Sequence, residues 1–128
     1  MTRPSDLKRG KNMNENNPKE INIADINLNT GSIVFNSVVR KKIGDKGIFN
    51  YIIHNSINPI GHLYILIKND DLIVDYINET QFAKIKFDFS KYFNMATLIV
   101  VTWDITKEIN LYINGKFKEK DIIKKFRD

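Results

Sequence analysis

Paired carboxylates are the first residues to test for chemistry, because two acids facing one cleft can hydrolyse a glycosidic bond. The two carboxyl groups must lie about 5 to 9 Å apart, which on a β-strand requires acids at positions i and i+2 or i+4. Asp104 and Glu108 have this spacing but flank an expected turn, and Asp70 and Asp71 fall on an expected hairpin tip. No Gly-rich phosphate loop or Gly-x-Ser-x-Gly sequence is present. We therefore predict no catalytic residue and no enzymatic activity.

Metal ligation is the next chemistry to test. The chain has no cysteine, which excludes disulfides and thiolate metal sites. His54 and His62 fall on different expected strands, and we interpret them as ordinary strand residues. No cofactor is expected, with calcium left open because carboxylate and amide oxygens in turns are its usual ligands. The turn residues of that type are Asp45, Asn69, Asp70 and Asp71.

Aromatic residues are the remaining candidates for ligand contact. Trp103 ends an apolar run, so we expect it to pack between sheets rather than to stack on a sugar. Tyrosine tolerates one edge in water, which makes it the better residue for an exposed aromatic platform. The predicted ligand-binding residues are Tyr51, Tyr64, Tyr76 and Tyr112. Core packing is the alternative role for each of them.

Short strands must position these residues. About nine apolar runs, separated by turn signals every eight to twelve residues, are typical of an all-β sandwich or barrel. Residues 81–89 alternate most clearly, with Ala83 and Ile85 on one face and Lys84 and Lys86 on the other. The continuously apolar run 96–103 is expected to be central and covered on both faces. These patterns predict an antiparallel all-β fold, either a sandwich or a barrel.

The composition divides the chain into three parts. Residues 1–19 are polar, contain two prolines, and read as a disordered leader. Residues 20–119 hold the strand signals and form the predicted β-sandwich domain. Residues 120–128 read as a basic C-terminal tail or a short helix, because Ile122, Ile123 and Phe126 would share one side of a helix.

One stretch resembles a known family. The sequence LIVVTWDITKEINLYINGK (98–116) is similar to the signature hairpin of laminin-G-like domains, which belong to the concanavalin A-like lectin/glucanase superfamily. The chain ends soon after the Asn114-Gly115 turn, so the resemblance is to a short or truncated variant. It implies a concanavalin A-like jelly roll and a binding module for a glycan or a protein surface. The Glu-x-Asp-x-x-Glu strand of the hydrolases in that superfamily is absent from this chain.

The distribution of charge limits the expected partners. The formal net charge is +5, but residues 21–114 are neutral, so nucleic acid is expected to bind only weakly, through the basic ends. No run approaches the roughly 18 to 20 apolar residues of a transmembrane helix, and no membrane partner is expected. The polar N-terminus does not read as a secretory signal. A cytoplasmic location is predicted, or an extracellular one if the chain is a domain of an exported protein.

A structural role is the alternative to ligand binding. The sequence has few residues after the Asn-Gly turn, and a sandwich that lacks its last strands exposes an edge that another chain can cover. This reading predicts an oligomerising β-sandwich, such as an accessory domain of a phage or a mobile element. A homo-oligomer is the partner that it implies.

Overall fold

Strands make up most of the described chain. The computed structural model describes the backbone of residues 19–22, 26–57 and 60–126, and the side chains of residues 26–53 and 60–126. The expected leader therefore lies almost wholly outside the described residues. In the described parts the one helical element is a short 3-10 turn, η1 (Ser90–Tyr92). None of them forms a helix that is long and apolar enough to cross a membrane.

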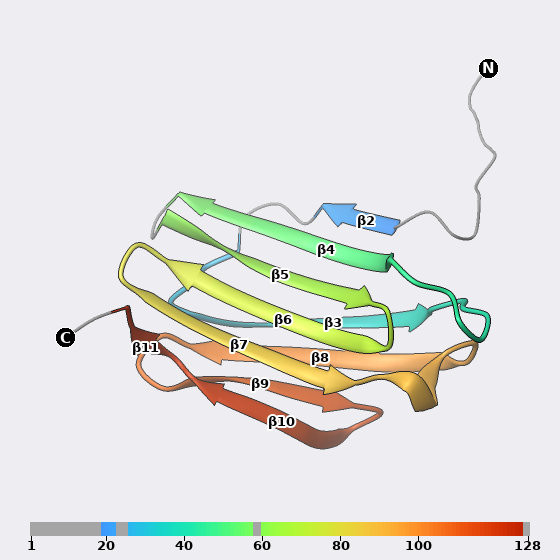
Figure 1. The fold of residues 1–128 in the computed structure, drawn as a ribbon. Coiled ribbons are helices and arrows are strands. Elements are labelled where there is room, and N and C mark those ends of the chain that lie inside the picture. The colour runs from blue at the N-terminus through green and yellow to red at the C-terminus, as the bar shows by residue number, and fades with distance from the viewer. Residues whose placement is uncertain (1–18, 23–25, 58–59, 127–128) are drawn as a thin grey trace.

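The strands form two sheets (Figure 1). The larger sheet has six strands in the spatial order β11-β7-β6-β5-β4-β2. In chain order these are β2 (Lys19–Asn22), β4 (Ile48–Ile57), β5 (Ile60–Lys68), β6 (Asp71–Asn78), β7 (Gln81–Asp88) and β11 (Lys124–Lys125). The smaller sheet has four strands in the order β10-β9-β8-β3. These are β3 (Thr30–Val38), β8 (Ala96–Asp104), β9 (Glu108–Ile113) and β10 (Lys116–Ile122).

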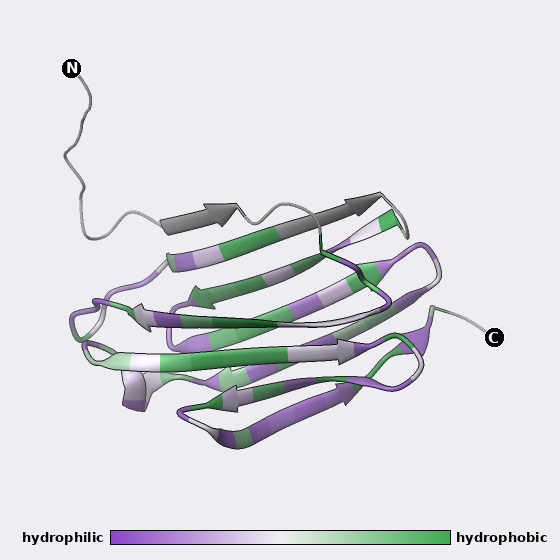
Figure 2. Ribbon diagram, turned by 180° about the vertical axis from the view of Figure 1, so that it is seen from behind, coloured by the Kyte–Doolittle hydropathy of each residue, from purple (hydrophilic) through white to green (hydrophobic). Residues whose placement is uncertain are grey.

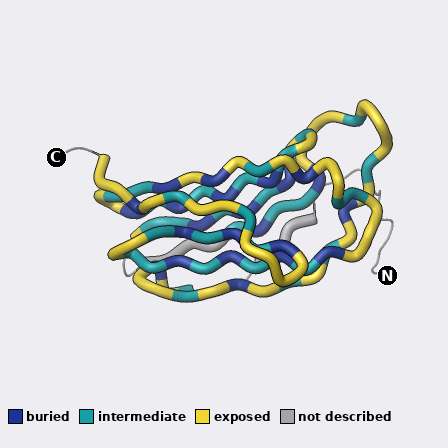
Figure 3. The backbone as a smooth tube through the Cα atoms, turned by 90° about the horizontal axis from the view of Figure 1, so that it is seen from below, coloured by how far each residue is buried: buried dark blue, intermediate teal, exposed yellow. Residues whose placement is uncertain are grey.

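Two meanders supply most of this architecture. Strands β4 to β7 pair in sequence order within the larger sheet, and β8 to β10 do so within the smaller one. Every pairing is antiparallel except that of β2 with β4, which is parallel. The two sheets stack face to face with the apolar core between them (Figure 3). The prediction of an antiparallel β-sandwich is confirmed.

Alternation of buried and exposed residues places the core as the sequence predicts. On β7, Ala83 and Ile85 are buried while Lys84 and Lys86 are exposed. On β9, Ile109, Leu111 and Ile113 are buried. Trp103 is 3% exposed and packs in the core, as expected. An inward face that buries one apolar side chain every second residue is what an antiparallel strand with one wet face requires.

Strand β8 departs from the expectation that both of its faces are covered. Its inward residues, among them Ile99 and Val101, are buried, whereas the outward Leu98 and Val100 are only half-buried. The strand is central within a four-stranded sheet that has one partner layer, so only one of its faces meets a second sheet. Figure 2 shows this outer side, with the apolar β8 separated from the polar edge strand β10 by β9.

The hairpin turns follow their predicted chemistry. Asn69, at the tip between β5 and β6, has φ +54°, and Asn114 and Gly115, between β9 and β10, have φ +52° and +82°. Asn and Gly tolerate this left-handed region better than other residues. The turns predicted at 69–71 and 114–116 are therefore confirmed, with 69–70 and 114–115 as the residues between the strands.

The described part of the C-terminal segment, residues 120–126, is not helical, which corrects the expectation of a tail or short helix over residues 120–128. Residues up to Ile122 belong to β10, and Lys124 and Lys125 form β11, which pairs with β7. Ile123 lies between these strands and is buried, and its N–H donates to the carbonyl of Lys107 at 2.9 Å. The strands bury Ile123 and pair the backbone on both sides of it. One or two isolated helical turns would be marginal in water, so the paired strands are the more stable structure.

Candidate functional site

Two of the four predicted tyrosines lie together on the outer face of the larger sheet. Tyr51 on β4 pairs with Leu66 on β5. The next pair of these strands that faces away from the core is Ile53 with Tyr64. Tyr51 and Tyr64 are therefore diagonal neighbours on one face. We call this surface the tyrosine face. It consists of Tyr51, Ile53, His62, Tyr64, Leu66, Ile73, Asp75, Ile77, Phe82, Lys84 and Lys86, all half-buried or exposed.

Strand β5 shows why aromatic and aliphatic residues lie outside. Leu63, Ile65 and Ile67 fill the core, and each is at most 3% exposed. The residues between them must then face away from the core, and these are Tyr64 and Leu66. Because β5 is apolar on both faces, the outer surface of the sheet is apolar where antiparallel sheets are usually polar.

Polar groups border the aromatic rings. Tyr64 pairs across the strands with Asp75 on β6, and Asp75 pairs with Lys84 on β7. A carboxylate and an ammonium group thus lie in the same cross-strand row as the phenol of Tyr64. The row offers an apolar surface together with hydrogen-bond donors and acceptors, as ligand sites commonly do.

His62 is part of the same surface. Its ring stacks on Tyr64 with the ring centroids 3.9 Å apart and the planes within 7° of parallel. Partial burial lowers the pKa of the His62 imidazole below its ordinary value, and the charge of Asp75 opposes that shift. The lowered pKa favours the uncharged ring at neutral pH, in which one nitrogen can donate and the other can accept a hydrogen bond.

The opposite border of the tyrosine face is formed by the C-terminal segment. The ring of Phe82 stacks on that of Phe126, with centroids 4.9 Å apart. The ammonium nitrogen of Lys124 lies 5.0 Å from the centroid of Phe82, within the range of a cation–π contact. The segment expected to be a tail thus extends the aromatic surface.

Tyr76 is a correction to the predicted site, because its side chain is fully buried. Its hydroxyl donates to the carbonyl oxygen of Leu28 at 2.7 Å and accepts from the amide of Asn78 at 3.2 Å. Burial raises the pKa of the Tyr76 phenol, and the Asn78 hydrogen bond opposes the rise. The sequence does hold a signal for the orientation of Tyr76, which is the preceding Asp75. A carboxylate at that position faces water, and side chains alternate along a strand, so the next residue faces the core.

Tyr112 does not join the other tyrosines. It lies on the outer side of the smaller sheet, where it pairs with Val100 on β8 and Phe117 on β10. Its ring meets that of Phe117 edge-on, with centroids 5.8 Å apart. The structure therefore divides the four predicted residues between the tyrosine face, the core and the opposite outer face.

The remaining candidates for chemistry have structural partners. A carboxylate oxygen of Asp104 accepts hydrogen bonds from the backbone N–H and the hydroxyl of Thr106, at 2.9 and 2.6 Å. Glu108 lies 3.7 Å from the ammonium of Lys120. The two acids therefore support a turn and a strand pair. The side chain of His54 lies outside the described residues.

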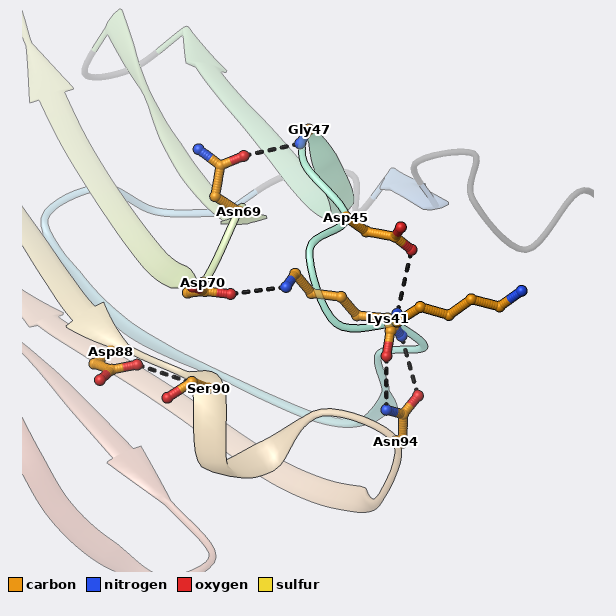
Figure 4. A network of polar contacts seen from close by, with 9 residues as sticks. Lys41, Asp45, Gly47, Asn69, Asp70, Asp88, Ser90 and Asn94 are labelled. Carbon is orange, nitrogen blue, oxygen red and sulfur yellow. Dashed lines mark hydrogen bonds and ion pairs between the residues drawn. The ribbon is translucent and has the colours of Figure 1, made fainter.

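Three of the four expected calcium ligands, Asp45, Asn69 and Asp70, lie in one group of loops, shown in Figure 4, and the fourth, Asp71, is the first residue of β6. We call the loops 39–47, 69–70 and 89–95 the Lys41 end. Asn69 accepts from the N–H of Gly47 at 2.8 Å, and Asp70 pairs with the ammonium of Lys41 at 2.8 Å. Asp45 accepts from the N–H of Lys42 at 3.2 Å.

These contacts engage one oxygen of each of the three side chains. Lys41 supplies a positive charge next to Asp70, and its side chain is only 9% exposed. It lies 5.0 Å from the ring centroid of Phe93. Nowhere in the described residues do three His, Asp or Glu side chains gather as ligands of one ion. The chemistry at this end is that of an ion pair that holds loops together.

The opposite end of the sandwich is held by buried groups. We call the loops 26–29, 78–81 and 104–108 the Trp103 end. The indole N–H of Trp103 donates to the carbonyl of Asn27 at 2.8 Å, one residue before the carbonyl that Tyr76 binds. An added Cβ on Gly31 would lie 2.6 Å from the Trp103 ring, so only glycine fits beside the indole.

Comparison with known proteins gives no relative from which a site could be transferred. No protein family, curated protein or solved structure matches this chain. The candidate site therefore depends on the geometry of the tyrosine face alone.

Proposed function

We propose that this chain is a non-catalytic binding module that recognises its ligand through the tyrosine face. The observation that carries the proposal is the gathering of Tyr51, Tyr64 and His62 on one outer face. A contiguous apolar surface bordered by polar groups is typical of an interaction site. The resemblance of residues 98–116 to laminin-G-like domains supports the same class of function.

A glycan is the ligand class that this surface fits best. Sugar rings have apolar faces that pack on aromatic side chains, and hydroxyl edges that need hydrogen-bond partners. Tyr64 and Tyr51 supply the aromatic surface, while Asp75, Lys84 and the neutral ring of His62 supply donors and acceptors. A protein surface is the alternative ligand for the same face.

The test combines a glycan array with matched tyrosine variants. The array identifies a binding glycan, and calorimetry then measures its affinity for the wild type, Tyr51→Ala and Tyr64→Ala. We expect each variant to weaken binding by about tenfold or more, as truncation of a central aromatic contact does. Tyr112→Ala is the control, because Tyr112 is also a half-buried tyrosine on an outer face, but of the other sheet.

Two results would contradict the proposal. One is an equal loss of affinity in Tyr112→Ala, which would mean that the tyrosine face has no special role. The other is the absence of binding both on the array and in pull-downs with candidate proteins. If a protein is captured by the wild type but not by Tyr64→Ala, the tyrosine face remains the binding site, and its ligand is a protein rather than a glycan.

Assembly is the second candidate function, and the free edge of β3 favours it. Among the described strands, β3 pairs only with β8, and its nine residues include no charge. Val34 is 62% exposed, and a cavity of about 90 Å³ lies between Phe35 on β3 and Ile52 on β4. By contrast, the opposite edge strand β10 reads KFKEKDI, and charged edges discourage pairing.

Sedimentation velocity over a range of concentrations tests this candidate. A β3-mediated oligomer should dissociate when a lysine is placed on the edge by Val34→Lys, because charged side chains block strand addition. Phe117→Lys on the already charged β10 is the control, since Phe117 is also an exposed apolar residue. A wild type that stays monomeric at the highest concentration would exclude self-assembly through this edge.

A further inference from the structure

The tip of the 40–47 loop carries a fully exposed isoleucine. Ile43 has a relative exposure of 105%, the highest among the exposed apolar residues of the described chain. Single exposed apolar residues are common on protein surfaces. Ile43 differs from most of them in two respects. Hydrogen bonds hold its loop in place, and cationic residues lie on both sides of it in the sequence.

Hydrogen bonds hold this loop at both ends. At its start, Asn94 accepts from the backbone N–H of Lys41 at 3.0 Å and donates to its carbonyl at 2.8 Å. At its end, Gly47 exchanges hydrogen bonds with Asn69. Within the loop, the N–H of Asp45 donates to the carbonyl of Lys42, and the N–H of Lys42 donates to the carboxylate of Asp45. The loop therefore presents its tip in a preformed conformation (Figure 4).

The charge of the loop is strongly positive. The segment RKKIGDKG (40–47) holds four basic residues and one acid, which gives it a formal charge of +3. Arg40, Lys42 and Lys46 are exposed. These three residues flank Ile43 on both sides in the sequence.

The acids in and beside the Lys41 end have partners. Asp70 pairs with Lys41, and Asp71 lies 3.7 Å from the ammonium of Lys86. Asp45 and Asp88 each accept a backbone N–H from a neighbouring residue. These carboxylates keep their charge, but the three loops of the Lys41 end together hold five basic and two acidic residues, a net formal charge of +3, so a partner would meet a cationic surface.

Further apolar and polar groups lie around the tip. Val38, Ile48 and Met95 flank the loop or the adjoining connection and are 45%, 39% and 49% exposed. A cavity of about 320 Å³ is lined by Ile43 itself and by residues of all three loops, among them Lys42, Asp70 and Phe93. The end thus combines an apolar tip with an adjoining recess that carries both cationic and anionic side chains.

We propose that the Lys41 end docks the domain on the surface of an anionic lipid bilayer. Ile43 enters the boundary between headgroups and acyl chains, while Arg40, Lys42 and Lys46 lie among the headgroup phosphates. Apolar insertion and cationic attraction are the two terms that hold peripheral proteins on membranes. This surface is separate from the tyrosine face, and it differs from the sequence expectation of no membrane partner.

Vesicle sedimentation of the full chain tests the proposal. Vesicles of about one part phosphatidylserine to three parts phosphatidylcholine supply the anionic surface, and pure phosphatidylcholine is the neutral comparison. The wild type should pellet with the anionic vesicles only, and less so as salt rises. Ile43→Ser should weaken this binding by about tenfold or more, from the lost burial of one isoleucine.

Ile122→Ser is the matched control, because Ile122 is an isoleucine 62% exposed on β10, next to the Trp103 end. It should leave vesicle binding unchanged. A charge variant, K42E/K46E, should abolish binding to the anionic vesicles. Thermal unfolding of all three variants checks that each is folded, which we expect because their substituted positions are exposed.

Three outcomes would overturn the proposal. The first is a wild type that pellets with neither kind of vesicle. The second is anionic binding that Ile43→Ser leaves unchanged, as would occur if the basic ends of the chain alone were responsible. The third is loss of vesicle binding by Tyr64→Ala, which would place the contact on the tyrosine face. Failure of glycan binding would leave the vesicle result unaffected.

Discussion

At the Trp103 end, Trp103 and Tyr76 bond to loop backbone from within the core, whereas at the Lys41 end Asn94 and Asn69 bond to loop backbone from exposed or half-buried positions. Leu28, whose carbonyl accepts from Tyr76, is 0% exposed. Ile43, whose loop is held by Asn94 and Asn69, is 105% exposed. The same kind of contact thus completes the core at one end and presents an apolar tip at the other.

The difference teaches how to separate structural from functional polar residues in this fold. A hydrogen bond that lets an apolar neighbour reach the core contributes to global stability. A hydrogen bond that fixes an exposed tip contributes mainly to local order. Variants at the Trp103 end should therefore lower the free energy of unfolding more than variants at the Lys41 end. Variants at the Lys41 end should speed amide exchange only near the substituted residue.

The largest effect is expected from Trp103→Ala. Removing a buried tryptophan leaves a cavity and an unpaired carbonyl at Asn27, so the free energy of unfolding should fall by about 3 to 5 kcal/mol. Urea unfolding followed by circular dichroism measures this loss. A loss below about 1 kcal/mol would show that the indole does not carry the packing of the Trp103 end.

A smaller loss is expected from Tyr76→Phe, which keeps the ring and removes only the hydroxyl. The carbonyl of Leu28 and the amide of Asn78 then each lose a partner in the core, at a cost of about 1 to 3 kcal/mol. Tyr112→Phe, on the outer face, should cost almost nothing. Equal losses in the two variants would contradict a special role for the buried hydroxyl.

Asn94→Gly should have a local effect. Glycine keeps the positive φ of this position, which is +65°, while the two bonds to the backbone of Lys41 are lost. We expect a loss of about 1 kcal/mol, with faster amide exchange confined to residues 40–47. Asn94→Ala should cost about 1 kcal/mol more, because alanine is strained at positive φ. Faster exchange throughout the core would contradict the local role.

The smallest effect concerns the titration of Asp104 at the Trp103 end. The hydroxyl and then the N–H of Thr106 lower the pKa of the Asp104 carboxyl below its ordinary value. Because the folded pKa is the lower one, this contribution to stability is present above the unfolded-state pKa and is lost as pH falls through the folded pKa. Thr106→Ala should raise the pKa of Asp104, as measured by NMR of its carboxyl carbon.

Asp88, next to the Lys41 end, is the internal control for that titration. Its pKa is lowered by the backbone N–H and the side chain of Ser90. Thr106→Ala should therefore leave the pKa of Asp88 unchanged. A shift of both carboxyl groups would indicate a change in the whole fold rather than the loss of one contact.

Much of the architecture could be predicted from local pattern. The alternation of residues 81–89 identified the inward face of β7, and Asn114-Gly115 identified a hairpin, because each pattern has one stable structural solution. The C-terminal segment could not be assigned in the same way. Ile122, Ile123 and Phe126 fit a helix by spacing alone, and only pairing with β7 and burial of Ile123 decide for strands.

The candidate site was harder to predict. Strand β5 is apolar on both faces, so periodicity alone does not say that Tyr64 faces out, whereas on β6 the carboxylate of Asp75 marks the outer face and places Tyr76 inward. The sequence named Tyr51, Tyr64 and Tyr76 alike, and the register of the sheet separates them. The exposure of Ile43 depends on contacts made by Asn94 and Asn69, which are distant in the sequence, so no local pattern could reveal it.

The pairing of β3 with β8 has a consequence for how the chain folds. Partners such as Val38 with Ala96 and Thr30 with Asp104 lie 58 to 74 positions apart, whereas both meanders close through short hairpins. Long-range pairing is slow because a large loop must close first. During synthesis β3 emerges well before β8, so its uncharged edge waits unpaired while the intervening strands are made. We expect that interval to be when the protein is most prone to aggregate.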